Sequence, residues 1–225
     1  IKRKRTAWQI WNKVDKSGTK VMIGEDGVRI FCFGDSNTYG YDARSRLGER
    51  LPAGERWPEI LAEQYGWEIQ NEGMNGRKIP GEAWSLAGFD RALLNWGETD
   101  LLLIMLGTND LLGVCFPDME EVGASMERFV RHVLKNPQIA GKGDRILLIA
   151  PPPTEIGRFG EYGLSFDRES MKFGSCYEKI AEEYGLRFAD AGRWGISLAH
   201  DGVHFTPEGH GIFAKRLGER IKQQL

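Results

Sequence analysis

From Val28 onward, short apolar runs alternate with longer amphipathic stretches. The apolar runs predict strands at residues 28–33, 67–71, 101–106, 145–150 and 186–189. The amphipathic stretches predict helices at residues 57–65, 81–96, 119–134, 167–184 and from 207 to the C-terminus. Strands that are apolar on both faces need helices on both faces. The alternation therefore predicts an α/β fold, a three-layer α/β/α sandwich around a five-stranded parallel sheet.

Residues 1–27 differ in character from the rest and carry no recognisable chemistry. They mix basic residues with Trp8 and Trp11. We expect either a short docked helix around residues 8–14 or a segment foreign to the native chain, with Met22 as the native start. Residues 28–225 contain no repeat or linker and are expected to form a single domain.

Charge and composition exclude several classes of partner. The 30 basic and 32 acidic residues give a net charge of −2, so we expect neither nucleic acid nor membrane as a partner. No apolar run approaches the roughly 20 residues that span a bilayer. Three scattered cysteines and the lack of a signal-peptide pattern favour a cytoplasmic location.

Polar residues follow the first strand, where the sequence reads Gly34-Asp35-Ser36. Gly34 permits a tight turn, so Ser36 falls where a helix would begin. Backbone N–H groups at a helix start are unpaired and can stabilise a developing negative charge. Ser36 is therefore a candidate nucleophile, although a plain N-cap explains this motif alone equally well.

Two further loops follow predicted strands. Gly76 could let a ligand approach its backbone N–H closely, and Asn109 could donate a side-chain hydrogen bond into the same crevice. Each motif is also ordinary turn chemistry, so neither indicates a site by itself.

The segment before the last helix is the most informative. Asp201 and His204 are three residues apart, so the carboxylate can accept the imidazole Nδ1–H. That contact leaves Nε2 free to take a proton from Ser36. Imidazole has an ordinary pKa of about 6.5, which suits a base near neutral pH.

Two other functions compete with this interpretation. His200, His204 and His210 reproduce the spacing of a zinc-protease helix, which would make the protein a zinc-dependent hydrolase. Gly202 and Pro207 weaken the helix that such a site needs. The other alternative is a non-catalytic binding module.

Together the four loops resemble the four blocks of the SGNH (GDSL-type) hydrolases, and the chain is most similar to the arylesterase/acyltransferase-like members. The resemblance rests on Gly34-Asp35-Ser36, Gly76, Gly107-Thr108-Asn109-Asp110 and Asp201-Gly202-Val203-His204, supported by Arg56-Trp57 and Pro151-Pro152-Pro153. It implies the flavodoxin-like SGNH fold, a carboxylic ester hydrolase, and a homo-oligomer. It also implies a triad of Ser36, Asp201 and His204, with an oxyanion hole from the Ser36 N–H, the Gly76 N–H and the Asn109 side chain.

Such an enzyme needs no metal or other cofactor and acts on a small-molecule acyl ester, with water or a second alcohol resolving the acyl-enzyme. Asn37 stands where the family usually has leucine, and we expect it to line the pocket wall. Four aromatic residues could complete a small acyl pocket: Tyr39, Tyr41, Trp57 and Trp84. Because no extended apolar segment offers a lid, we expect short-chain acyl esters as substrates.

Overall fold

The computed structural model describes residues 11–14, 20–23, 27–45 and 47–224. The strands are β1 (Trp11–Val14), β2 (Lys20–Ile23), β3 (Arg29–Gly34), β4 (Glu68–Gly73), β5 (Leu101–Met105), β6 (Ile146–Ala150) and β7 (Arg187–Asp190). The α-helices are α1 (Ser36–Tyr39), α2 (Trp57–Tyr65), α3 (Ala83–Trp96), α4 (Thr108–Leu112), α5 (Met119–Lys135), α6 (Glu161–Ser170), α7 (Phe173–Tyr184) and α8 (Pro207–Gln224). Single 3₁₀ turns are η1 (Ala53–Glu55), η2 (Gly143–Arg145), η3 (Ile156–Phe159) and η4 (Ala191–Arg193).

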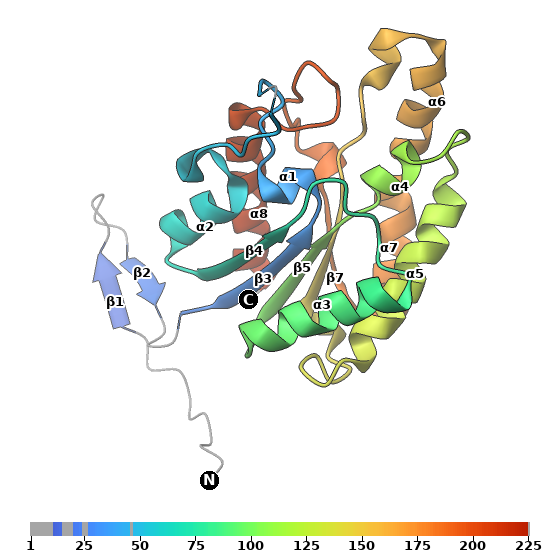
Figure 1. Cartoon of the computed structure of the whole chain (residues 1–225). Helices are drawn as coiled ribbons and strands as arrows, with labels where there is room; N and C mark the ends of the chain where they lie inside the picture. The colour runs from blue at the N-terminus through green and yellow to red at the C-terminus, as the bar shows by residue number, and fades with distance from the viewer. Residues whose placement is uncertain (1–10, 15–19, 24–26, 46, 225) are drawn as a thin grey trace.

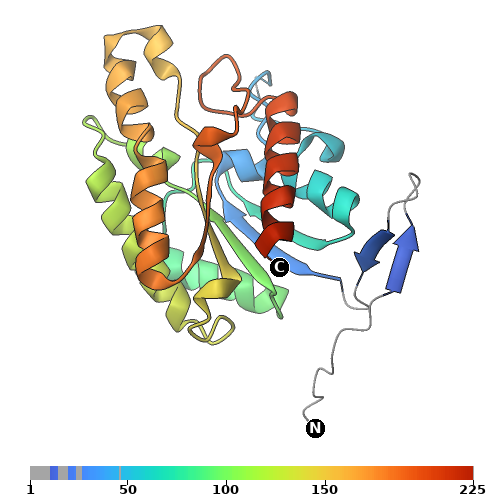
Figure 2. The same ribbon diagram turned by 180° about the vertical axis from the view of Figure 1, so that it is seen from behind.

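The main sheet has five parallel strands in the order β4-β3-β5-β6-β7. Helices α3, α5 and α7 cover one face, and α2 and α8 cover the other (Figures 1 and 2). This arrangement confirms the predicted three-layer α/β/α sandwich. Because all five strands are parallel, their carboxyl ends meet at one edge, where reactive groups gather in such folds.

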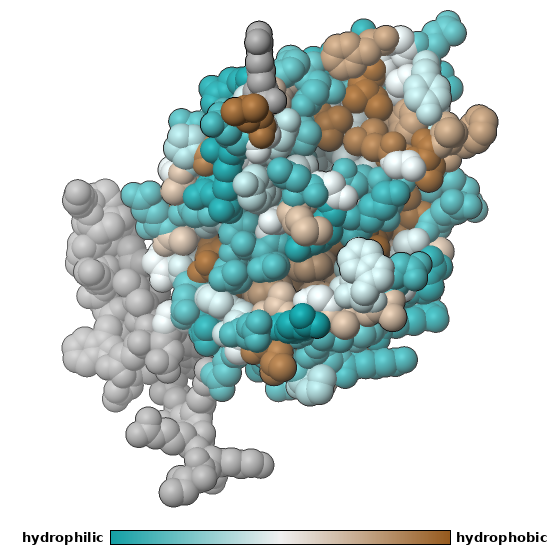
Figure 3. Space-filling model, viewed as in Figure 1, coloured by the Kyte–Doolittle hydropathy of each residue, from teal (hydrophilic) through white to brown (hydrophobic). Residues whose placement is uncertain are grey.

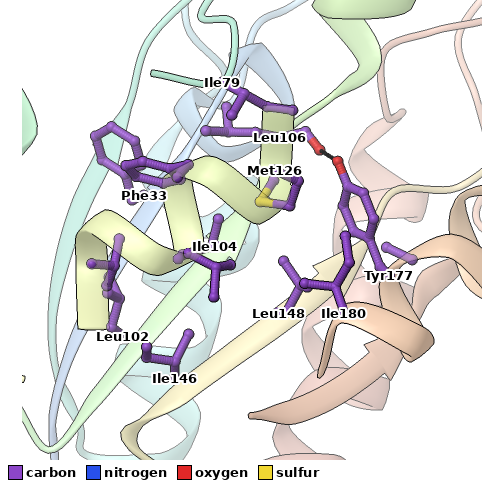
Figure 4. Close-up of a cluster of buried hydrophobic side chains, with 14 of the residues drawn as sticks. Phe33, Ile79, Leu102, Ile104, Leu106, Met126, Ile146, Leu148, Tyr177 and Ile180 are labelled. Atoms are coloured by element: carbon purple, nitrogen blue, oxygen red, sulfur yellow. Dashed lines mark hydrogen bonds between the residues drawn. The ribbon is translucent and has the colours of Figure 1, made fainter. Parts of the chain in front are cut away.

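The central strands are buried on both faces, which explains their continuous apolar runs. Alternate residues of β5, such as Leu102 and Ile104, face α3 and α5, where they meet β6 residues including Leu148 (Figure 4). The intervening residues, such as Leu103, face α2 and α8. The buried Tyr177 belongs to the same cluster as Leu102 and Ile104. Its hydroxyl donates to the Leu106 carbonyl at 2.9 Å.

The single helix predicted at residues 167–184 is wrong, because the structure divides this region between α6 and α7. The two helices are separated at residues 171–172, directly after the buried Ser170. The Ser170 hydroxyl donates to the Asp167 carbonyl and accepts the Thr154 N–H at 3.0 Å. This tie to the segment after β6 lies at the end of α6, just before the two-residue break that precedes α7.

The helix expected around residues 8–14 is also wrong over the part that can be compared. Trp11–Val14 is a strand, β1, that pairs antiparallel with β2, while residues 8–10 lie outside the described residues. Both segments contain β-branched residues, which favour this extended pairing. Within the described residues, β1 and β2 form their own two-stranded sheet and pair with no strand of the main one. No helix in these ranges is long and apolar enough to cross a bilayer.

Two glycines allow α1 to lie directly on the sheet. A Cβ at Gly73, the last residue of β4, would lie 2.0 Å from the backbone nitrogen of Tyr39. A Cβ at Gly34 would lie 2.0 Å from the Thr38 hydroxyl oxygen. The short helix that begins with Ser36 can therefore occupy its place only because neither strand end carries a side chain.

Replacing Gly73 by alanine tests this constraint. Since the obstructing atom is backbone, α1 must shift as a whole, and we expect Gly73→Ala to lower the free energy of unfolding by more than about 2 kcal/mol. Gly54→Ala is the matched control, because its Cβ would meet nothing within 4 Å. Chemical denaturation measures both variants, and equal stabilities would contradict the proposed close approach.

Candidate active site

Ser36 is the first residue of α1 and follows β3 after a single connecting residue. That connecting residue, Asp35, caps the helix: its carboxylate accepts the Asn37 N–H at 2.9 Å. The Ser36 side chain is mostly buried, with the residue 6% exposed. A hydroxyl held in this way has little conformational freedom and faces the carboxyl edge of the sheet.

Asp201 and His204 lie in the turn that precedes α8. The Asp201 Oδ2 atom is 2.7 Å from His204 Nδ1, and Oδ1 accepts the backbone N–H groups of Val203 and His204 at 2.9 and 3.0 Å. Burial alone would raise the pKa of Asp201. The hydrogen bonds from His204 and Val203 outweigh burial and hold the pKa below its usual range. Asp201 therefore stays ionised near neutral pH.

The structure brings Ser36 and His204 together from opposite ends of the chain. The Ser36 Oγ atom is 2.9 Å from His204 Nε2, across 168 positions in sequence. Oγ, the imidazole ring and the Asp201 carboxylate thus form one continuous hydrogen-bonded chain. The arrangement can remove a proton from the serine hydroxyl and stabilise the imidazolium that results.

Gly76 and Asn109, the two other candidate oxyanion donors, are connected by hydrogen bonds to Gly34 at the end of β3. The connection runs through Arg77. The Met74 N–H and the Arg77 guanidinium both donate to the Gly34 carbonyl, at 3.2 and 2.9 Å. Asn109, in α4, donates one amide hydrogen to the Arg77 carbonyl at 3.1 Å and keeps a second. Gly76 lies in the same loop at φ 72°, and the described residues provide no acceptor for its N–H.

Arg77 and Asp110 support the candidate site, although the sequence analysis did not name Arg77 and gave Asp110 no role. The Arg77 guanidinium lies 4.1 Å from the Phe33 ring centroid and also contacts Glu72. The Asp110 carboxylate accepts the Ile79 N–H, and burial raises the pKa of Asp110 to about 6. Both residues hold the loop that carries Gly76. A charged residue directly after a candidate ligand-binding glycine is the signal that could have found Arg77.

Two of the predicted pocket residues have other surroundings, and their placement corrects the sequence analysis. Trp57 is 1% exposed and lies in the core between the sheet and α8, where its ring meets Phe213. The polar atoms of the Asn37 amide are taken up by hydrogen bonds to the backbone of Val203 and Phe205, so this side chain does not form an open pocket wall.

The other three aromatic residues differ in their distance from the triad. The Tyr41 ring lies against the His204 imidazole, with centroids 4.4 Å apart. Tyr39 instead lies beneath the Arg50 guanidinium, at 4.7 Å. Trp84 is 77% exposed in the first turn of α3. Of the four, Tyr41 is the one that the described contacts place against a triad residue.

The histidines of the zinc alternative do not share a helix. His200 is exposed in a turn, His204 faces Ser36, and His210 is buried in α8, where its Nδ1 accepts the Trp57 N–H at 3.4 Å. The zinc-protease motif needs the first two histidines on one helical face, so this geometry does not support it. The described residues contain no group of three or more metal-ligating side chains.

Comparisons with known proteins agree with this geometry. Residues 32–212 match the sequence profile of the GDSL-like Lipase/Acylhydrolase family. An Agrobacterium tumefaciens protein whose arylesterase activity is inferred is 30% identical, with a TM-score of 0.75, covering 88% of this chain and all of its own. A carbohydrate acetylesterase from Sinorhizobium meliloti and an aryl esterase from M. smegmatis are each 25% identical, with TM-scores of 0.73 and coverages of 88% and 100%. No curated protein sequence matches the chain significantly.

The buried cap makes a prediction about stability and pH. Asp35 is 2% exposed, and burial raises its pKa from 3.8 to about 6, against the opposing effects of the Asn37 N–H, His204 and Arg77. The folded protein keeps a proton on this carboxyl that the unfolded chain releases near pH 4. The free energy of unfolding therefore falls as pH rises from about 4 to about 6.

Asp35→Asn keeps an oxygen for the Asn37 N–H and removes the charge. We expect it to raise the free energy of unfolding by about 1–3 kcal/mol at pH 7.5, with the gain shrinking towards pH 4.5. Denaturant unfolding at the two pH values measures the effect. A gain that does not depend on pH would contradict the raised pKa.

Proposed function

Since this chain belongs to the GDSL-like lipase/acylhydrolase family and is a carboxylic ester hydrolase, we propose that Ser36, His204 and Asp201 form its catalytic triad. The observation that carries the proposal is the hydrogen-bonded chain from Ser36 Oγ through the imidazole to Asp201, with distances of 2.9 and 2.7 Å. These separations are within the reach that general-base catalysis requires.

In the first half-reaction, Ser36 Oγ attacks the ester carbonyl carbon while its proton passes to His204 Nε2. Asp201 holds the ring through Nδ1–H and stabilises its positive charge. The carbonyl oxygen becomes an oxyanion. When the C–O bond to the alcohol breaks, the oxyanion reverts to a carbonyl and the alcohol leaves with the proton from Nε2. Water then attacks the acyl-enzyme in the same way and releases the acid.

The oxyanion would receive hydrogen bonds from the N–H groups of Ser36 and Gly76 and from the second amide hydrogen of Asn109. What supports this assignment is the hydrogen-bonded connection of both loops to Gly34, beside the nucleophile. Removing one such donor typically costs a hundredfold to a thousandfold in rate, on the order of 3–4 kcal/mol.

Short-chain acyl esters are the proposed substrates. The Tyr41 ring lies 4.4 Å from the His204 imidazole, and we infer that it takes up space near the reacting carbon. One structural relative is a carbohydrate acetylesterase, which supports a small acyl group, and another is an aryl esterase. A second alcohol could replace water in the last step, because the same base can deprotonate either nucleophile. Transfer of the acyl group to such an alcohol is part of the proposal.

Replacing the nucleophile gives the direct test. We expect Ser36→Ala to lower kcat on p-nitrophenyl acetate by at least about a thousandfold, because no other group can form the acyl-enzyme. The matched control is Ser175→Ala, at an exposed position in α7. A fluorophosphonate should add one adduct to the wild-type protein, at Ser36, as measured by mass spectrometry. Near-wild-type turnover in Ser36→Ala would refute the assignment.

The acyl preference is tested with p-nitrophenyl esters of graded chain length. We expect kcat/KM for acetate to exceed that for octanoate by at least about tenfold, because the longer chain needs apolar space beside the triad. Figure 3 shows apolar side chains gathered around α6 and the α4–α5 connection, among them Phe116, Phe159 and Leu164. Phe116→Ser should leave the preference unchanged. A preference for octanoate would overturn the short-chain proposal. Loss of that preference in Phe116→Ser would show that these apolar side chains bind the long acyl chain.

A further inference from the structure

The turn that carries His204 has no regular secondary structure, so hydrogen bonds must fix the imidazole in place. Two of these bonds are internal to the turn. The His204 N–H donates to Asp201 Oδ1 at 3.0 Å, and the His204 carbonyl accepts the Ala199 N–H at 2.7 Å. Because these partners lie in the same segment, they shape the turn but do not hold it against Ser36.

The peptide groups on either side of His204 are bonded to α1 instead. The Asn37 Nδ2 atom donates to the Val203 carbonyl at 3.1 Å, and Oδ1 accepts the Phe205 N–H at 2.9 Å. Asn37 is the residue directly after Ser36. One side chain thus spans 166 and 168 sequence positions and holds both neighbours of the base at a fixed distance from the nucleophile.

The chemistry of these two contacts requires an amide. The Phe205 N–H can only donate and the Val203 carbonyl can only accept, so a single side chain must offer an acceptor and a donor side by side. Leucine is of similar size but offers neither. It would leave both backbone groups without these partners in a buried place.

The backbone of Asn37 is itself held in place by two hydrogen bonds. Its N–H is bound by the Asp35 carboxylate at 2.9 Å, and its carbonyl accepts the Trp57 indole N–H at 3.0 Å. Trp57 is held in the core beneath α8. Asn37 is only 5% exposed and its amide oxygen and nitrogen are both engaged, so it positions other groups rather than touching substrate.

We propose that Asn37 is a positioning residue, whose amide holds the His204 turn so that Nε2 stays within hydrogen-bond reach of Ser36 Oγ. This inference rests on the proposed function, because it assigns Asn37 a task within the same triad. His204 keeps Asp201 as a partner without Asn37, since those two residues share one turn. What Asn37 maintains is the position of the His204 turn relative to Ser36, through its bonds to Val203 and Phe205.

Asn37→Leu removes both contacts at nearly constant volume. Asn37→Ser leaves room for water to satisfy the two backbone groups, so it keeps the test valid if the leucine variant does not fold. For either variant we expect kcat on p-nitrophenyl acetate to fall at least about tenfold with KM within about threefold, because a small displacement of the base slows proton transfer. The rate of inactivation by a fluorophosphonate should fall in parallel.

The downfield proton resonance of His204 Nδ1–H provides a readout that a merely structural role would not predict. We expect this resonance, recorded with the Ser36→Ala protein as a reference for the intact His204–Asp201 pair, to persist in both Asn37 variants. Its loss would mean that the turn itself has come apart, which would overturn the positioning role.

Asn136→Leu is the matched control. Asn136 is also buried, and its amide binds Asp90 and the Gln138 N–H at the end of α5. We expect it to lower the melting temperature without changing kcat or the inactivation rate. Wild-type kcat in a folded Asn37 variant, or an equal loss in Asn136→Leu, would overturn the inference. An active Ser36→Ala protein would instead overturn the proposed triad, so the two failures are distinguishable.

Discussion

The backbone of α1 lies against the end of β4 so closely that position 73 has no room for a side chain. This approach sets the height and direction of a helix only four residues long, which could not hold its place by its own hydrogen bonds. The sheet therefore acts as the support for Ser36. The loop carrying Gly76 is bonded to the same sheet edge at Gly34 through Arg77, and Asn109 is bonded to that loop at the Arg77 carbonyl, so the candidate donors are held by one connected set of hydrogen bonds.

Two carboxylates near His204 have opposite electrostatic surroundings. Asp201 accepts three hydrogen bonds from the turn, which lower its pKa. Asp35 is fully buried, and its pKa is raised to about 6. The difference follows from burial, which dominates at Asp35, and from the hydrogen bonds that Asp201 accepts, foremost the one from the His204 imidazole. One carboxylate is thereby suited to stabilise a positive ring, whereas the other caps the helix on which the serine sits.

The strands of the main sheet were predicted well, because each one is encoded by a short apolar run that can be recognised locally. Runs such as residues 101–106 are apolar on both faces, and that pattern has few other solutions. The break after Ser170 could not be predicted in this way, since it depends on the hydroxyl of that residue reaching Thr154 in another segment. The β1–β2 pairing was missed because segments of four residues show too little periodicity to separate strand from helix.

The candidate catalytic residues could be recognised from short local motifs, but the contacts of the residues around them could not. Trp57 could line a pocket or enter the core, and only the packing of α2 against α8 decides. For Asn37 the partners lie more than 160 positions away, so no local pattern could have revealed them.

The separation of Ser36 and His204 along the chain also determines when the proposed triad can form during protein synthesis. The serine leaves the ribosome well before the imidazole and the helix that follows it, since 168 positions separate the two side chains. Side chains of that helix, among them Phe213 and Leu217, complete the core on one face of the sheet. A nascent chain would therefore carry the serine of the proposed triad without its base until His204 and α8 have been made and can fold onto the sheet.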